Sequence, residues 1–546
     1  MFVEHGRIML SGKGNFMTFS FESGNFTVLG SSDLGSLLPS WSALPFVGLL
    51  LSLALFPLFA PKFWQRNYHF VVMFWGLLLA LPFLWFFGKP AMTEICHLIL
   101  LDYIPFMILL LSLFTVAGGI YLKGALKGTP LTNLILLVIG TLIASWIGTT
   151  GASMLLIRPV IRSNAARKSK AHIIVFFIFL VSNIGGSLTP LGDPPLFLGF
   201  LRGVPFFWTF HLLPITLFVS VSALAIFFLL DTFYYLREKH HLPPLTRIFH
   251  AWREISALRA STPALQSCAQ DYARVSLEQG AKHRVETCQS ANRALTGAYE
   301  QERCSCEICG LSEQNIQAPL RLHGSHNFFY LAGIIAAVLF SGVADLGQIV
   351  IFHTAIKIQN IIRDVLLLGF SLLSLQTTSK YIRAENHFHW GPMKEVAIVF
   401  AAIFITILPA LAMLRAGSNG QLAFITNAAR EPWHYFWITG LLSSFLDNAP
   451  TYLTFLTTAL GNFANGLPER TAIIKLMAEH PVILQAISAG AVFMGANTYI
   501  GNAPNFMVRA IAEENGIKMP SFFGYMVYSL AILLPLFVLA TWIFFI

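Results

Sequence analysis

The sequence of 546 residues has little charge, because Asp, Glu, Lys and Arg together make up only 11% of it. Its hydrophobic residues make up 55%, and its mean hydropathy is +0.67. A water-soluble globular protein carries about 25% charged residues. The chain therefore lacks the polar surface of a soluble enzyme or of a nucleic-acid-binding domain. The same apolar composition argues against a secreted disulfide scaffold.

Nucleotide-binding and catalytic motifs are missing as well. The sequence contains no GxxxxGK phosphate loop, which argues against ATP-driven pumping by this chain. It contains no HExxH or GxSxG motif either, which argues against an intramembrane hydrolase. We therefore expect neither an enzyme nor a resident cofactor, and no nucleic acid as a partner.

Long apolar runs are what the chain has instead. They follow one another from residue 41 to residue 546, and one of them covers residues 328–352. Runs of about 20 apolar residues cross the hydrocarbon core of a bilayer. A membrane β-barrel would show segments of about ten residues that alternate in polarity. The sequence thus predicts an all-α polytopic membrane protein whose main partner is the lipid bilayer.

Composition divides the chain into four parts. Residues 1–40 form a polar N-terminal arm, residues 41–236 and 327–546 hold the two sets of apolar runs, and residues 237–326 form a polar insert. The insert contains Cys304, Cys306 and Cys309, which match only part of a zinc-binding pattern. A plain cytoplasmic insert with free thiols is the preferred interpretation, and a metal site is the alternative.

Two short segments repeat each other in the two apolar halves. Residues 186–195 (GSLTPLGDPP) align without a gap with residues 495–504 (GANTYIGNAP), so that Asp193 falls opposite Asn502. Upstream of each segment, small polar residues interrupt another apolar stretch, at 148–153 (GTTGAS) and at 447–451 (DNAPT). Each half therefore contains two predicted breaks in its membrane segments.

Basic residues set the predicted topology, since cytoplasmic loops are enriched in Lys and Arg. Both ends of the stretch at 131–157 are basic, which makes this stretch a re-entrant hairpin; the residues are Lys123, Lys127, Arg158, Arg162, Arg167, Lys168 and Lys170. The same reasoning makes residues 433–460 a hairpin that enters from outside. About ten transmembrane helices and two re-entrant hairpins result, in two inverted repeats with broken helices at the midplane.

Two aspartates lie inside the predicted breaks. An ionised carboxylate at this depth needs a counter-charge, and neither break contains a Lys or Arg. A bound cation or a proton fills that need, so Asp193 and Asp447 are candidate cation ligands and proton carriers. The alternative for each is a helix N-cap, a role that Asp fills well.

These motifs resemble those of the ion transporter superfamily, which includes citrate transporters, arsenite permeases and D-type sodium/proton antiporters. The resemblance rests on residues 182–195, 447–451 and 495–504 and extends over 41–236 and 320–546. It is strongest to the bacterial branch described as citrate transport proteins or sodium:proton antiporters. It implies a homodimer in the bacterial cytoplasmic (inner) membrane, with a scaffold part and a transport part that moves in an elevator-like manner.

The resemblance also implies Na⁺ bound between each hairpin tip and the neighbouring broken helix. Carried over by position, one site has Thr149, Thr150, Ser153, Asn183 and Thr189, and the symmetric one has Asp447, Asn448, Thr451, Asn497 and Thr498. The dicarboxylate branch typically shows Ser-Asn-Thr at its hairpin tips. Here the tips read Thr-Thr-Gly and Asp-Asn-Ala-Pro-Thr, which departs from that pattern.

Three hypotheses for function follow. The first is Na⁺/H⁺ antiport, in which Asp193 and Asp447 alternate between a proton and Na⁺. The second is transport of citrate or another small organic or inorganic anion, coupled to Na⁺ or H⁺. The third is a membrane sensor that does not transport and uses the polar insert for signalling.

Overall fold

The computed structural model describes residues 2–4, 7–12, 15–20, 38–124, 126–239, 321–352, 354–386 and 388–546. Within these ranges, nine helices are long and apolar enough to cross a membrane. A tenth span results if the pair Glu469–Glu479 and Pro481–Asn497, bent by 102°, counts as one. The prediction of an all-α polytopic membrane protein is confirmed.

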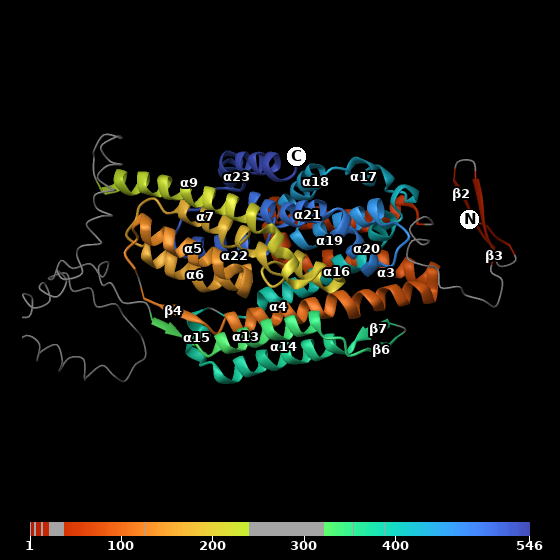
Figure 1. The fold of residues 1–546 in the computed structure, drawn as a ribbon, viewed down its shortest axis with the longest axis horizontal. Helices are drawn as coiled ribbons and strands as arrows, with labels where there is room; N and C mark the ends of the chain where they lie inside the picture. Colours follow the sequence, from red (N-terminus) through yellow and green to blue (C-terminus); the bar gives the residue numbers. More distant parts are fainter. Residues whose placement is uncertain are drawn as a thin grey trace, which may run out of the picture.

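Each half of the chain builds the same succession of helices (Figure 1). The first half contains α2 (Leu44–Phe59), α3 (Pro61–Leu98), α4 (Ile104–Ala117), α5 (Pro130–Ile147), α6 (Thr149–Ser163), α7 (Ala171–Leu180), α8 (Pro194–Arg202) and α9 (Leu213–Lys239). The second contains α13 (Asn327–Val343), α14 (Ile358–Thr377), α16 (Gly391–Arg415), α18 (Pro432–Phe445), α19 (Asn448–Phe463), α21 (Pro481–Met494), α22 (Ala503–Glu514) and α23 (Phe522–Phe544), with the shorter α15 (Lys380–Glu385), α17 (Ala423–Ala428) and α20 (Glu469–Glu479) between them.

Short pieces of other structure connect these helices. A π-helical turn at Ile99–Tyr103 joins α3 to α4, and 3₁₀ turns occupy Ser40–Ala43, Ile184–Leu188, Phe206–Leu212, Gly417–Asn419 and Gly495–Asn497. In the described residues, strands form three small antiparallel sheets: β1 (Phe2–Glu4), β2 (Arg7–Gly12) and β3 (Asn15–Ser20); β4 (Tyr121–Lys123) and β5 (Arg321–His323); β6 (Gln348–Ile351) and β7 (Thr354–Lys357).

Both predicted hairpins are present. In the first, the chain reverses at Gly148 (φ +80°), and its outer ends meet where Asn133 Nδ2 donates to Asn164 Oδ1 over 3.0 Å. In the second, the start of α18 and the end of α19 meet where Asn462 Nδ2 donates to the Tyr435 hydroxyl over 2.9 Å. Figure 1 shows α5 and α6 approaching the centre from one end of the molecule, and α18 and α19 from the other.

The packing of the two halves also repeats. Helix α3 packs against α16, and its counterpart α14 packs against α4. Helix α6 packs against α22, and its counterpart α19 packs against α8. Each half therefore completes the other, because the second arm of each hairpin packs against a short helix of the opposite half.

Burial separates a central helix from peripheral ones. The apolar window within Ala171–Leu188 is 89% buried, whereas that within Arg66–Lys89 is only 22% buried. Large apolar side chains such as Phe74 and Trp85 are exposed on α3. A broad apolar surface of this kind suits lipid rather than water.

The basic segments gather at one end of the molecule, as the topology predicts. Arg162 Nη1 donates to the Tyr121 hydroxyl over 2.9 Å, and that hydroxyl donates to Glu385 Oε2 over 3.0 Å. Arg167 forms an ion pair of 3.3 Å with Glu238 near the end of α9. These contacts connect the end of the first hairpin with the segments around α15 and α9.

The other end is tied by a second ion-pair network. Arg202, at the end of α8, lies 2.9 Å from Asp102 Oδ2 and 2.6 Å from Glu469 Oε1. Arg415, at the end of α16, lies 3.3 Å from Glu469 Oε2. The network joins the region between α3 and α4 to α8, α16 and α20.

Two features depart from the sequence-based expectations. The apolar run at 328–352 is not one span, because α13 ends at Val343 and β6 and β7 follow it. The polar arm, to which the sequence assigns no structure, contains the sheet β1–β3. The boundaries at residues 40, 236 and 326 stay predictions, and the cysteines of the insert lie outside the described residues.

Candidate functional site

Eight helix ends meet at the centre of the two halves. Helices α5, α7, α18 and α21 end there, and α6, α8, α19 and α22 begin there after short non-helical segments. Helix N-termini carry partial positive charge and C-termini partial negative charge. The centre thus presents both kinds of terminus to a bound ion.

Asp193 lies in the middle of this arrangement. Its side chain is 1% exposed, and its carboxylate accepts hydrogen bonds from Thr149 Oγ1 (3.2 Å), Asn448 Nδ2 (2.7 Å) and Asn502 Nδ2 (3.2 Å). The residue occupies the N-cap position of α8, but its carboxylate forms no capping bond in the described structure. It joins both hairpin tips and the second broken helix instead.

Asp447 has a different role. It is the N-cap of α19, and its Oδ1 accepts from the backbone N–H of Ala449 over 3.1 Å. Its backbone carbonyl accepts from Thr451 Oγ1 over 3.0 Å. Of the two interpretations of Asp447, the N-cap is confirmed by this geometry. Its half-buried side chain directly precedes Asn448, whose amide donates to Asp193.

The two broken helices are shaped by matching threonines. Thr189 Oγ1 donates to the carbonyl of Ser145, and Thr498 Oγ1 donates to the carbonyl of Ser444 over 2.5 Å. Each threonine oxygen also accepts backbone N–H groups of its own loop. Both threonines therefore hold the non-helical backbone against the neighbouring hairpin, which satisfies groups that would otherwise be unpaired at this depth.

Asparagines connect one broken helix to the other. Asn183 Nδ2 donates to Asn505 Oδ1 over 2.7 Å, and Asn505 Nδ2 donates to the carbonyls of Gly495 and Thr498 over 2.9 Å each. Asn502 Nδ2 donates to Asn183 Oδ1 over 3.2 Å. The two predicted sites therefore form one continuous network around Asp193.

Asn505 is the network residue that the sequence analysis misses. The internal repeat places Leu196 at the equivalent position, so the repeat gives no signal there. The sequence did contain one signal for this residue. Asn505 follows a predicted break closely, and an amide in the first turn of such a helix can reach the broken segment.

Asn505→Ala is expected to lower the stability of the protein by about 2 kcal/mol, because two buried carbonyls and the Asn183 amide lose their partner. The measurement is the apparent Tm of the purified protein in detergent. Asn515→Ala is the matched control, since Asn515 is exposed just after α22 and, among the described residues, its amide donates only to the Ile511 carbonyl. Equal Tm values for the two variants would contradict the role given to Asn505.

The other predicted site residues line the same region. Ser153 Oγ lies 2.9 Å from Ser182 Oγ, and Asn497 Nδ2 donates to Ser444 Oγ over 2.9 Å. Thr150 follows Thr149 at the first tip and is half-buried. Whether these groups bind Na⁺ stays a prediction. No cluster of three or more His, Cys, Asp or Glu side chains suited to a metal occurs among the described residues.

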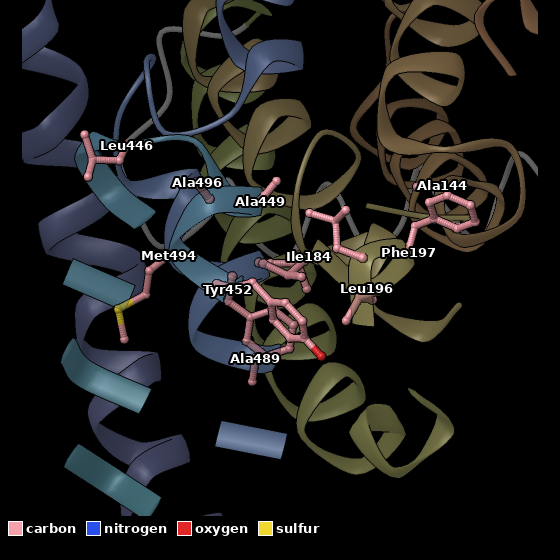
Figure 2. Close-up of a cluster of buried hydrophobic side chains, with 14 of the residues drawn as sticks. Ala144, Ile184, Leu196, Phe197, Leu446, Ala449, Tyr452, Ala489, Met494 and Ala496 are labelled. Atoms are coloured by element: carbon pink, nitrogen blue, oxygen red, sulfur yellow. The ribbon is translucent and has the colours of Figure 1, made fainter. Parts of the chain in front are cut away.

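Apolar side chains surround the polar network. Figure 2 shows Leu446 and Ala449 at the second tip, Ile184 in the first broken helix, and Leu196 and Phe197 in α8. Burial of the network among such groups lowers the local dielectric, which strengthens interactions between a carboxylate and a bound ion.

Comparison with known families bears on this arrangement. A family model described as "Putative citrate transport" matches residues 35–253 and 298–545, which is most of the chain. The chain belongs to this family. The match covers both halves and both broken helices, and it extends further into the polar insert than the resemblance seen in the sequence. No curated protein matches the chain significantly.

Membership of this family, together with the apolar helices, makes the chain a multi-pass membrane protein of a family described by transport. Secondary transporters commonly bind their substrates at discontinuous helices.

Proposed function

We propose that this protein is a cation-coupled secondary transporter of citrate or a related small carboxylate anion. In this proposal Asp193 binds the coupling cation, Na⁺ or H⁺, and the helix N-termini around it attract the anion. An elevator-like movement in a homodimer, as implied by the resemblance, carries the site across the membrane.

The observation that carries the proposal is a buried carboxylate with only neutral partners. Among the described residues Asp193 forms no ion pair, and its three donors are a hydroxyl and two amides. Neutral donors stabilise an anion less than a positive charge does, and removing a carboxylate from water costs several kcal/mol. A bound Na⁺ or a proton supplies what the side chains do not.

The same carboxylate supports coupling. Unoccupied, Asp193 and the nearby Asp447 oppose the approach of a carboxylate substrate by like-charge repulsion. A cation bound at Asp193 neutralises this charge, and the N-termini of α6, α8, α19 and α22 then favour an anion. Cation binding therefore raises the affinity for the anion, and by linkage anion binding raises the affinity for the cation by the same factor.

The test is uptake of labelled citrate into proteoliposomes that contain the full chain. Citrate is expected to accumulate with an inward Na⁺ or H⁺ gradient and to equilibrate only slowly when both gradients are collapsed. Empty liposomes and liposomes given an inward K⁺ gradient are the controls. Absence of citrate uptake under every gradient would contradict the proposal.

A second candidate function, Na⁺/H⁺ antiport, is favoured by the placement of Asp447 directly before Asn448, whose amide donates to Asp193 Oδ2 over 2.7 Å. Two acids close together offer a site at which a proton and Na⁺ compete. In the absence of any organic anion, this function predicts that an inward Na⁺ gradient raises the internal pH of the proteoliposomes. An outward Na⁺ gradient is expected to lower it. A pH change that requires citrate supports the first proposal instead.

A further inference from the structure

An open cavity of about 420 Å³ lies at the basic end of the molecule, outside the site at the centre. Its walls come from both halves of the chain: the link between α6 and α7, the link between α22 and α23, and the sides of α9 and α23. Four basic side chains and two tyrosines line it, namely Arg167, Lys168, Lys170, Lys518, Tyr234 and Tyr528. Neither proposed function uses this cavity.

The cavity has an excess of positive charge. None of its described lining residues is Asp or Glu. Arg167 is neutralised by Asp231 at 2.8 Å and Glu238 at 3.3 Å. Lys168 and Lys518 pair with no carboxylate in the described part of the chain, and Lys170 Nζ donates only to the carbonyl of Ala165, over 2.8 Å. Three ammonium groups thus remain without a negative partner.

Two further features favour an anion at this place. Ala171 and His172, the first two residues of α7, line the cavity, and the preceding Lys170 provides no side-chain cap for that helix. The start of a helix attracts anions through its free N–H groups. Glu513, just before the link between α22 and α23, pairs with Arg509 at 2.9 Å.

We propose that this cavity binds a phosphate group, carried either by an anionic lipid headgroup or by a small soluble phosphate. A phosphate accepts charge-assisted hydrogen bonds from lysine and also accepts from tyrosine hydroxyls and backbone N–H groups, all of which the cavity offers. The cavity lies where α7, α9 and α23 reach the basic end of the molecule. Basic and tyrosine side chains at the ends of membrane helices typically meet lipid headgroups. An occupant connects the first hairpin with the last helix of the second half.

The test uses the full chain in detergent and the triple variant Lys168→Gln, Lys170→Gln, Lys518→Gln. Calorimetry measures the Kd for inorganic phosphate, for short-chain phosphatidylglycerol and for short-chain phosphatidylcholine. The triple variant is expected to raise the Kd of the bound probe at least about tenfold, because three charges are lost. The control Lys127→Gln, Lys380→Gln, Lys394→Gln removes the same charge from exposed positions near the same end and is expected to leave the Kd within about twofold.

The source of the phosphate follows from which probe binds. Tighter binding of phosphatidylglycerol than of inorganic phosphate assigns the cavity to lipid, and the reverse assigns it to a soluble phosphate. Binding of phosphatidylcholine as tightly as phosphatidylglycerol, binding of neither anionic probe, or equal effects of the two triple variants would each overturn the proposal. Because the probes contain no citrate and need no gradient, the result does not depend on the proposed transport function.

Discussion

Replacing Asp193 by Asn is expected to lower cation-coupled uptake at least about 100-fold. The amide carries no negative charge for the cation, and its NH₂ group faces the donors Thr149, Asn448 and Asn502. A hydrogen bond to a charged group contributes about 1.5–3 kcal/mol, and a loss of about 2.8 kcal/mol corresponds to 100-fold in binding. The measurement is the initial rate of gradient-driven citrate uptake, with Na⁺-driven pH change measured in parallel.

Two further variants serve as comparisons for Asp193→Asn, one outside the site and one within it. Asp345→Asn makes the same chemical change at an exposed position between α13 and β6 and is expected to transport as the unmodified protein does. Asp447→Asn is expected to have the smaller effect of the two site variants, about tenfold or less, because its carboxylate is half-buried and an Asn side chain also caps a helix. Unchanged coupled uptake by an Asp193→Asn protein that elutes and melts normally would refute its role.

Much of the architecture was predictable because a bilayer restricts the length of the segments that cross it and the charge of the loops on each side. Apolar length fixed the number of spans, and the basic links on either side of residues 131–157 required both ends of that stretch to lie on one side. The structure places those ends together through Asn133 and Asn164. The repeated segments predicted two equivalent breaks, and Thr189 and Thr498 occupy equivalent places in them.

The different roles of Asp193 and Asp447 were not predictable from the sequence. Both precede a helix and both fall in a polar break, so the same two interpretations, cation ligand and N-cap, apply to each. Only the meeting of the tips decides that Asp447 caps its own helix while Asp193 accepts from residues 44, 255 and 309 positions away in the chain. Asn505 was missed in part for the same reason, since its partner Asn183 comes from the other half and lies 322 positions away.

Apolar composition alone also failed to separate helix from strand at the end of α13. Residues 348–351 are Gln, Ile, Val and Ile, which extend the apolar run but favour strands through β-branching. Gly347, with φ +84°, turns the chain just before them. A glycine followed by β-branched residues is therefore a local signal that outweighs the length of an apolar run.

Gly192→Ala is expected to destabilise the protein by about 3 kcal/mol and to abolish uptake. A Cβ at this position would lie 2.1 Å from the carbonyl oxygen of Gly186, so the backbone of the first broken helix has to move. That loop carries Asp193 and the Gly192 carbonyl, which accepts from the N–H of Thr149 over 2.9 Å. The repeat supplies a graded comparison, because a Cβ at Gly501 would lie 2.6 Å from the carbonyl oxygen of Gly495.

The matched control is Gly369→Ala in α14, where a Cβ would meet nothing within 4 Å. Alanine is favoured over glycine in a helix by about 1 kcal/mol, so this variant is expected to melt at or above the unmodified protein. The Tm should therefore fall in the order Gly369→Ala, Gly501→Ala, Gly192→Ala, with uptake lost in the last. A Gly192→Ala protein with unchanged Tm and uptake would mean that the tight approach of the two glycine backbones does not hold the broken helix in place.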